Sequence, residues 1–334
     1  MKRKILSLCT AMLVLLTACG SNQSEQETEN KQVKQIGISQ FAQHPSLDNI
    51  REGIIEGLKE EGFVEGDNIK IDYQNSDTKI DVANQIGSNF AAKDYDLVLG
   101  IATPSAMTAF SYTRDKEIPL IFSGVSDPVG AKLVNEDFSA LAKVTGVSDQ
   151  LPVKTQLEMI RTILPEAKSL GIIYTTSEAN SVSTIEIYKS LVADYGFELE
   201  LVGVSSSAEI PLAADNILAK VDAITNLTDN TVVNSLPTIL AKANEKKIPV
   251  FGSEIEQVKA GSLAAEGIDY FALGKESGKM AARVLNGEDI ESISATKAEE
   301  SKLYINKKVA EDLGININGE MLNKAEEIFD SVEN

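Results

Sequence analysis

Residues 34–62 read KQIGISQFAQHPSLDNIREGIIEGLKEEG, and this stretch decides the fold. Its first part, residues 34–41, is a short run rich in β-favouring residues and predicts a strand. In residues 46–62 apolar side chains recur at the spacing of one helix face, and Gly62 follows as a stop signal. The apolar positions are Leu47, Ile50, Ile54, Ile55 and Leu58. The stretch therefore predicts a strand followed by an amphipathic helix.

The same alternation continues along the chain. Strands are predicted at 68–75, 95–101 and 118–124, with helices between them at 79–93 and 103–115. Strict alternation of strand and helix implies parallel strands joined by right-handed crossovers. The first part of the chain is therefore predicted to be a doubly wound α/β domain.

A second series of the same kind begins after residues 143–150. Its predicted helices are 152–165, 181–196, 208–220, 230–247 and 254–261, and its predicted strands are 169–176, 198–205, 221–227, 248–253 and 262–269. The two series share a signature, since KEIPLIFSG at 116–124 is echoed by KKIPVFGS at 246–253. We therefore predict an α/β protein with two similar doubly wound parallel-sheet domains.

The first residues have the layout of a secretory signal. A basic start, residues 2–4, precedes an apolar core of roughly a dozen residues, too short to span a bilayer, which takes about 20. Leu16-Thr17-Ala18-Cys19 resembles a bacterial lipobox, in which the cysteine is lipidated and becomes the mature N-terminus; the alternative is an ordinary signal with a cysteine there by chance. Residues 1–18 are thus a predicted lipoprotein signal peptide, Cys19 the lipidation site, and residues 19–33 a flexible tether.

Composition excludes several classes of partner and reaction. The net charge is -19, and removal of the signal, which holds three basic residues and no acid, makes it -22, so nucleic acid and anionic headgroups are repelled.

Cys9 lies in the removed signal, so no internal disulfide is expected. His44 is the single histidine; it could line a cleft, but a loop residue without a chemical role is the favoured reading. No phosphate-binding glycine motif is present. We expect no enzyme, metal or cofactor.

Polar side chains follow the predicted strands. In a parallel sheet, ligands bind beyond the carboxyl ends of the strands, where helix N-termini present free amide groups. The loops there are 39–41, 102–105, 124–127, 176–181, 228–230, 253–254 and 269–270. They are rich in hydroxyl, amide and acidic side chains and contain no arginine or lysine. Each such side chain can instead cap its own helix.

A zwitterion suits this set of loops. Hydroxyl groups and helix N-termini can hold a carboxylate, while an acid can receive an ammonium group. The acidic candidates for the ammonium are Asp127, Asp229, Glu254 and Asp269. Phe41 and Tyr270 also fall on these loops, and their rings could stack on a ligand or simply pack a loop.

Several runs together resemble a known family. They are GISQFAQHPSLDNIREG, GIATPSA, IFSGVSDPVGAKLV, VTGVSD, LGIIYTTSEANS, TDNTVV and AAEGIDYFALGKESGKMA. With the lipobox and tether, they resemble the substrate-binding lipoproteins of ABC importers, in the subgroup of the type I periplasmic-binding-protein fold that includes tryptophan- and phenylalanine-binding members. The resemblance implies a Venus flytrap whose two domains are joined by a three-strand hinge.

The resemblance also implies domain boundaries and site residues. The N-terminal lobe would take 34–147 and 271–287, and the C-terminal lobe 148–270 and 288–330. Ligand contacts are expected from Phe41, Thr103, Ser105, Ser126, Asp127, Asn180, Ser181, Asp229, Asn230, Glu254 and Asp269. Within this set Thr103, Ser105 and Ser126 would hold the polar end of the ligand, and Asn180 and Ser181 would face them. Glu254 or Asp269 would bind the ammonium, and Phe41 is the stacking candidate.

The predicted function is capture of a small amino acid for an ABC importer. The family, more than the composition, points to tryptophan or phenylalanine, because the chain contains no tryptophan and few aromatic residues. The protein would be a monomer held on the extracytoplasmic face of the cell membrane by its lipid, and would deliver its ligand to a permease. The alternative is a sensor lipoprotein that presents a bound ligand to a membrane receptor.

Overall fold

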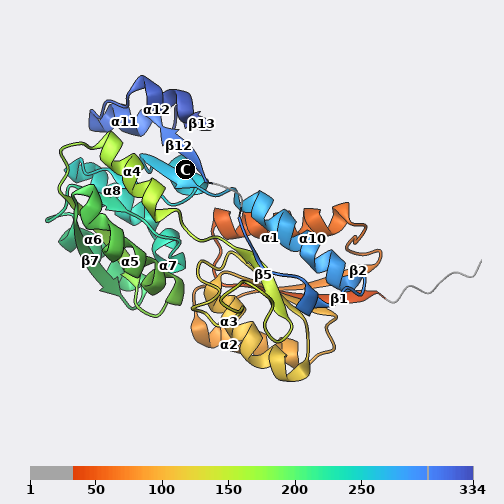
Figure 1. Ribbon diagram of the computed structural model, residues 1–334. Helices are drawn as coiled ribbons and strands as arrows, with labels where there is room; N and C mark the ends of the chain where they lie inside the picture. Colours follow the sequence, from red (N-terminus) through yellow and green to blue (C-terminus); the bar gives the residue numbers. More distant parts are fainter. Residues whose placement is uncertain (1–32, 299–300, 334) are drawn as a thin grey trace, which may run out of the picture. The chain divides into compact units, whose positions relative to one another are not determined.

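The first sheet is built around the predicted opening strand. The computed structural model describes residues 33–298 and 301–333, which belong to one unit of the chain. Strand β1 (Lys34–Gln40) lies within a six-stranded sheet of order β11-β5-β4-β3-β1-β2, and all its pairings are parallel. The other strands are β2 (Ile69–Asn75), β3 (Leu97–Ile101), β4 (Leu120–Ser123), β5 (Val144–Ser148) and β11 (Thr296–Lys297). The predicted parallel α/β class is therefore confirmed for this part (Figure 1).

Helices cover both faces of this sheet. One face carries α1 (Pro45–Glu60) and α10 (Tyr270–Leu285), whose apolar side chains share a core with β1 and β3. The other carries α2 (Ile80–Ala91) and α3 (Thr103–Thr113), which pack on β3, β4 and β5. A short 3-10 turn, η1 (Arg114–Lys116), follows α3. We call this sheet and its helices the first lobe.

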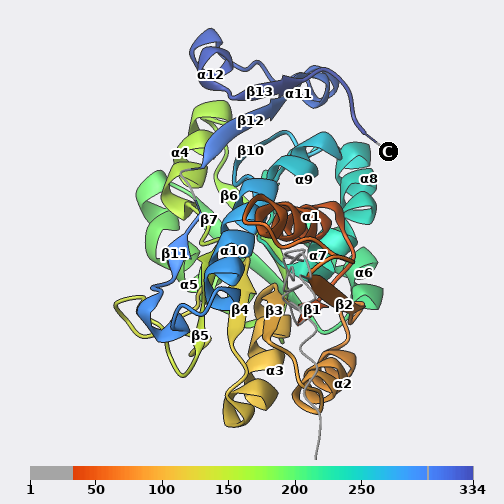
Figure 2. The ribbon, with the colours of Figure 1, turned by 90° about the vertical axis from the view of Figure 1, so that its right-hand side faces the viewer.

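Helices α1 and α10 are more than 200 residues apart in the sequence, yet they lie side by side along much of their length (Figures 1 and 2). Glycine residues form the contact between them. A Cβ atom at Gly274 of α10 would lie 2.2 Å from the backbone oxygen of Ile50, and one at Gly53 of α1 would lie 2.2 Å from that of Phe271. Gly57 and Gly278 continue the contact one turn later, with values of 2.3 Å. No side chain fits in this seam, so the two backbones are in direct contact.

The second lobe contains two sheets. A parallel sheet has the order β7-β6-β8-β9, and a smaller one has the order β10-β12-β13, in which β10 and β12 run antiparallel. These strands are β6 (Ser169–Thr175), β7 (Glu198–Val204), β8 (Ala223–Thr225), β9 (Val250–Phe251), β10 (Ala264–Gly267), β12 (Lys302–Asn306) and β13 (Glu327–Phe329). A hydrogen bond of 2.9 Å from Gly252 N to Ala264 O connects the two sheets. The antiparallel pair differs from the wholly parallel sheet that was predicted.

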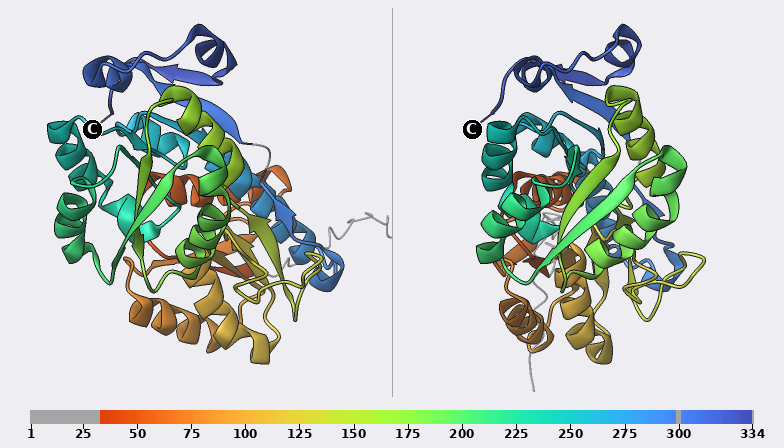
Figure 3. Two further views of the ribbon diagram at one scale, coloured as in Figure 1. Left: turned by 60° about the vertical axis from the view of Figure 1, so that its left-hand side comes forward. Right: turned by 90° about the vertical axis from the view of Figure 1, so that its left-hand side faces the viewer.

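Most helices of the second lobe lie on both sides of its parallel sheet, and the last two lie beside β12 and β13 (Figure 3). The helices are α4 (Val153–Ile163), α5 (Ala179–Leu191), α6 (Ile210–Ile217), α7 (Asn230–Asn234), α8 (Leu236–Lys246), α9 (Ile255–Lys259), α11 (Lys307–Leu313) and α12 (Gly319–Lys324), with the 3-10 turns η2 (Val192–Tyr195) and η3 (Ser207–Glu209). Two buried clusters hold them, one under α4 and α5 and one under α6 and α8. The single helix predicted over 230–247 is two helices, because the chain turns at Ser235 before Pro237.

The chain passes between the lobes three times. It leaves the first lobe after β5, returns between β10 and α10, and leaves again after β11. The last boundary differs from the prediction, because residues 288–298 stay with the first lobe. Ile290, at the start of the 3-10 turn η4 (Ile290–Ser292), and Ile293, just after it, are buried in the core of the first lobe beside α10. Strand β11 pairs with β5.

Among residues 33–298 and 301–333, no helix has the length and apolar character needed to cross a bilayer. The predicted signal peptide, the predicted lipidation site Cys19 and the predicted tether fall in residues 1–32, apart from Val33, and so lie outside the described residues.

We expect Gly274→Ala to lower the free energy of unfolding by about 1–3 kcal/mol, as overpacking of a tight contact does. The added methyl would meet the Ile50 backbone oxygen, which cannot turn aside as a side chain can. Gly319→Ala in α12 is the control, because nothing lies within 4 Å of its added Cβ. Urea unfolding curves measure both; equal midpoints for Gly274→Ala and wild type would contradict the expectation.

Candidate functional site

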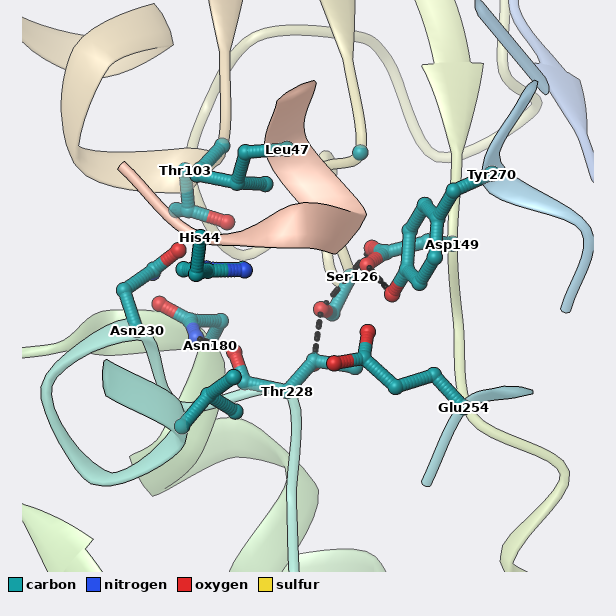
Figure 4. Close-up of a pocket in the computed structure, with 13 residues that line it drawn as sticks. His44, Leu47, Thr103, Ser126, Asp149, Asn180, Thr228, Asn230, Glu254 and Tyr270 are labelled. Carbon is teal, nitrogen blue, oxygen red and sulfur yellow. Dashed lines mark hydrogen bonds between the residues drawn. The ribbon is translucent and has the colours of Figure 1, made fainter. Parts of the chain in front are cut away.

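A cavity lies where helices from both lobes begin. About 290 Å³ between the atoms, part of it open to solvent, belongs to the cavity. It is lined by 13 residues: His44, Leu47, Ala102, Thr103, Gly124, Ser126, Asp149, Asn180, Thr228, Asn230, Val233, Glu254 and Tyr270 (Figure 4). His44, Ala102 and Glu254 immediately precede α1, α3 and α9, while Tyr270 is the first residue of α10. Helix N-termini carry partial positive charge and free amide groups, so this is a place suited to an anionic group.

One end of the cavity is acidic. Asp149 accepts hydrogen bonds from Ser126 Oγ (2.9 Å) and from Tyr270 OH (2.8 Å), as Figure 4 shows. Glu254 accepts hydrogen bonds from Ser46 Oγ (2.6 Å) and from Gln257 Nε2 (3.1 Å). Within residues 33–298 and 301–333, neither carboxyl group has a cationic partner, and no lysine or arginine is among the lining residues.

Burial changes the acidity of this end. Burial raises the pKa of the Asp149 carboxyl. Burial, and next the charge of Glu256, raise the pKa of Glu254 to about 8. Burial raises the pKa of Tyr270 well above its ordinary value, with Asp149 as the next cause, so its hydroxyl stays a donor. Two buried acids without a cation make this end favourable for a positively charged group.

The other end is neutral and has polar atoms without partners. Among the described residues, neither ring nitrogen of His44, nor Thr103 Oγ1, nor Asn180 Oδ1 has a hydrogen-bond partner. Burial lowers the pKa of His44 to about 4. The Asn230 side chain lies close enough to the ring to oppose this in part, although it makes no hydrogen bond of good geometry with either ring nitrogen. The imidazole is therefore neutral at pH 7, with one donor and one acceptor.

Hydrogen bonds join the lobes around the cavity. Ser126 Oγ lies 3.0 Å from Thr228 Oγ1, and Ser46 Oγ donates to Glu254. Two more bonds lie nearby: Asn49 Nδ2 donates to Glu256 Oε1 (2.6 Å), and Ser183 Oγ donates to Asp127 Oδ2 (2.6 Å). All four pairs connect a residue of the first lobe with one of the second, so the described conformation is closed over the cavity.

The wall on the first lobe includes a strained residue. Ala102 has φ 73 and ψ 155, a conformation that L-residues other than glycine rarely adopt. Such a residue costs of order 1–3 kcal/mol and persists only where its surroundings impose it. Ala102 N donates to Ser123 O (3.0 Å), and the turn aims the start of α3 at the cavity.

A buried carboxylate supports the wall on the second lobe. Glu178 accepts hydrogen bonds from the backbone and side chain of both Asn230 and Thr231, at 2.6–3.0 Å. Burial, and then the neighbouring Asp229, raise its pKa to about 7. Glu178 thereby fixes Asn230, which lines the cavity.

The structure brings together five of the predicted site residues. Thr103, Ser126, Asn180, Asn230 and Glu254 all line the cavity, from both lobes. Their contact with a ligand remains a prediction.

Six other predicted residues lie away from the cavity wall. Phe41 is 3% exposed and packs in the core of the first lobe, so it is not placed to stack on a ligand in this cavity. Ser105 Oγ accepts from Ser39 Oγ at 3.2 Å, and Asp127 caps its own loop through Gly130 N and binds Ser183.

The remaining three predicted residues form hydrogen bonds with the backbone of a helix start or with a neighbouring side chain. Asp229 caps α7 and binds Thr175, and Ser181 donates to the same carboxylate at 2.7 Å. Asp269 is exposed and caps α10 through Ala272 N at 3.0 Å. Asp269 therefore lies outside the cavity, whereas Asp149 and Glu254 line it, and the acid that would bind an ammonium stays a prediction.

Sequence reasoning missed Asp149 and undervalued His44. Asp149 follows β5, a strand that was not predicted, so its loop was never counted among the strand ends. His44 was taken for a loop residue without a role, but it is buried and lines the cavity. Tyr270 was recognised as an aromatic candidate, although its hydroxyl, and not only its ring, faces the site. In the described ranges, no cluster of three or more histidine, cysteine or acidic residues could hold a metal ion.

Comparison with known proteins gives the same picture. The family model described as ABC transporter substrate binding protein matches residues 35–329. A tyrosine-binding protein of Clostridioides difficile (strain R20291) is 39% identical over 313 residues, which cover 91% of this chain and 90% of the relative.

Two similar solved structures differ in their ligand, one with L-Trp bound and one ligand-free and open. An ABC domain from Streptococcus pneumoniae in complex with L-Trp is 37% identical and has a TM-score of 0.86. The alignment covers 89% of this chain and 100% of that domain. A ligand-free, open substrate-binding protein with adhesive properties from Clostridium difficile is 34% identical, with a TM-score of 0.68 and coverage of 90% of this chain and 100% of that one. The higher similarity to the liganded structure agrees with the hydrogen bonds that join the lobes here.

These findings confirm the predicted type I periplasmic-binding-protein fold. Since the matching proteins bind solutes, the prediction that the chain is not an enzyme is also confirmed. The match extends over nearly all of the described residues, and the chain therefore belongs to the family of ABC transporter substrate-binding proteins.

Proposed function

We propose that this protein captures an aromatic amino acid in the cavity between its lobes and delivers it to the permease of an ABC importer. The observation that carries the proposal is the pair of buried carboxyl groups, Asp149 and Glu254, that face the cavity without a cation. The tyrosine-binding relative and the structure with bound L-Trp support an aromatic amino acid.

The ammonium group would lie at the acidic end. A cation there would stabilise the ionised forms of Asp149 and Glu254, which burial disfavours. Charge-assisted hydrogen bonds from an ammonium are about twice as strong as neutral ones. An amine would therefore bind with a proton leaving Glu254 near neutral pH.

The carboxylate would lie close to the start of α3. Thr103 Oγ1 has no partner in the described residues, and the first amides of an 11-residue helix have no acceptor within the helix. Ser126 also lines the cavity, but its hydroxyl proton is donated to Asp149, so the carboxylate would rely on Thr103 and the helix amides. A carboxylate here would need no arginine.

Closure follows from contacts to both lobes. The first lobe supplies Thr103, Ser126 and Asp149, while the second supplies Asn180 and Glu254. A ligand held by both sets binds the closed form better than the open one and so shifts the population toward it. The closed form would be the one that the permease recognises.

The lipid anchor at Cys19 belongs to the same proposal. A capture protein for an importer must stay at the extracytoplasmic face of the membrane, and two or more acyl chains on one cysteine give stable anchoring. The acidic residues of the chain fit an exported binding protein and not a nucleic-acid partner.

We expect tyrosine, tryptophan or phenylalanine to stabilise the protein in a thermal-shift panel of the twenty amino acids. A ligand at 100 times its dissociation constant adds about 2.7 kcal/mol to the stability of the folded state.

The double variant Asp149→Asn, Glu254→Gln should bind the same ligand at least about a hundredfold more weakly, since each lost charged hydrogen bond costs about 1.5–3 kcal/mol. Asp269→Asn, outside the cavity, is the control and should bind normally. No stabilisation by any amino acid would refute the proposed function.

The pKa of Glu254 predicts a pH dependence of stability without ligand. Folded Glu254 keeps a proton that the unfolded chain releases between about pH 4.5 and 8, so its contribution to stability is complete below 4.5 and is lost as pH rises through 8. In Glu254→Gln this loss is absent, and the variant should gain stability over wild type as pH rises. His44 has the opposite trend but is common to both proteins. Chemical unfolding at several pH values measures the difference; the exposed Glu136→Gln is the control. A difference that stays constant with pH would contradict it.

Replacement of Cys19 by alanine should release the protein from the membrane fraction. The thioether-linked lipid needs the Cys19 sulfur, whereas Cys9→Ala changes only the segment expected to be removed. Cell fractionation with an antibody to the protein compares the two variants with wild type. Membrane association of Cys19→Ala equal to that of Cys9→Ala would exclude a lipid anchor at this position.

A further inference from the structure

The neutral end of the cavity offers unpaired polar atoms on buried side chains. His44 is 7% exposed, Thr103 and Asn180 are each 3% exposed, and the unpaired atoms are both His44 ring nitrogens, Thr103 Oγ1 and Asn180 Oδ1. Buried polar groups are nearly always hydrogen-bonded in folded proteins. These atoms are therefore places where a bound molecule would complete the hydrogen bonding.

The orientation of the Asn180 amide is fixed by its neighbours. Its Nδ2 donates to Thr228 O at 2.9 Å and lies 3.4 Å from Glu178 Oε2, and both partners are acceptors. The amide oxygen is thereby left as the atom that needs a partner, and it can only accept. An ionised carboxylate has no proton to give it, so the Asn180 oxygen is not a partner for the carboxylate of an amino acid, which Thr103 and the start of α3 would hold instead.

His44 complements that acceptor. Because burial keeps the imidazole neutral, one ring nitrogen donates and the other accepts. Figure 4 shows the ring between Thr103 on one side and Asn180 and Asn230 on the other, away from Asp149 and Glu254. Leu47, Ala102 and Val233 add apolar surface to the same cavity, as an aromatic ring requires.

We propose that His44 and Asn180 recognise a hydrogen-bond donor on the side chain of the ligand, so that the site selects an aromatic amino acid with a hydroxyl or an indole N–H over phenylalanine. This inference rests on the proposed function, which places the ammonium at Asp149 and Glu254 and the carboxylate at the start of α3, and so leaves His44 and Asn180 for the side chain. A site built to hydrogen-bond a ligand group discriminates strongly against an analogue that lacks it, because its buried polar atoms are then left unpaired.

The test is a comparison of three ligands by isothermal titration calorimetry. The wild-type protein should bind tyrosine or tryptophan at least about tenfold more tightly than phenylalanine, the effect of about one hydrogen bond. In His44→Leu this ratio should fall toward one, chiefly through weaker binding of the ligand with the donor. His44 makes no side-chain cap on α1, so the replacement removes no helix cap.

Further variants separate recognition from folding. His44→Asn keeps a donor and an acceptor and should restore part of the preference over phenylalanine. Asn180→Ala should reduce the preference independently of His44. Ser105→Ala is the matched control, since Ser105 is buried beside Ser39 but does not line the cavity, and its ligand preference should equal that of wild type.

Two results would overturn the inference. One is a wild-type protein that binds phenylalanine as tightly as both tyrosine and tryptophan. The other is an equal loss of affinity for all three ligands in His44→Leu, which would mean that His44 contacts the groups common to every amino acid. In both cases the capture of amino acids would still stand. If none of the three ligands bound wild type, the proposed function itself would be wrong, and this inference with it.

Discussion

The direct contact between the backbones of α1 and α10 is the constraint on which the site depends. Gly53 and Gly57 of one helix lie against Gly274 and Gly278 of the other, with no room for a methyl group at the positions of closest approach. Helix α1 begins next to His44 and helix α10 begins with Tyr270, so the seam fixes the distance between the neutral and the acidic ends of the cavity. Helix α10 also follows directly after a crossover from the second lobe, and the seam therefore ties one of the three connections to the first lobe.

The cavity joins two chemical environments that a zwitterion with a polar side chain would fill. Asp149 and Glu254 lack a cation, whereas His44 and Asn180 lack neutral hydrogen-bond partners. The absence of lysine and arginine from the lining means that helix N-termini and hydroxyl groups carry the positive side of the site. Buried polar atoms that the protein leaves unpaired are costly. That cost is what gives such a site selectivity, since a molecule that satisfies only half of the atoms gains little.

The sequence predicted most of the fold, because strands and helices alternate regularly and their apolar residues recur at different spacings. It failed where a short element lacked that signal. Strand β5 has five residues with Gly146 inside, and the antiparallel pair β10 and β12 is separated by a whole helix of the other lobe. The same failure hid Asp149. Strand-end loops did contain Thr103, Ser126, Asn180, Asn230 and Glu254, since parallel strands bring their ends to one edge. The sequence could not show that Asp229 and Asp269 turn back to cap their own helices, because that depends on a side-chain rotamer and not on position in the chain.

The hydrogen bond between Ser46 and Glu254 makes the stability of the closed form depend on the charge of Glu254. Ser46 belongs to the first lobe and Glu254 to the second, and the carboxyl group that accepts this bond also lines the cavity. An ionised carboxylate is a stronger acceptor than a protonated one, by roughly a factor of two in energy. Any cation that draws the proton from Glu254 thus strengthens the hydrogen bond that Ser46 of the other lobe donates to the same carboxylate. A neutral molecule of the same shape leaves Glu254 protonated, and the hydrogen bond from Ser46 then stays in its weaker form.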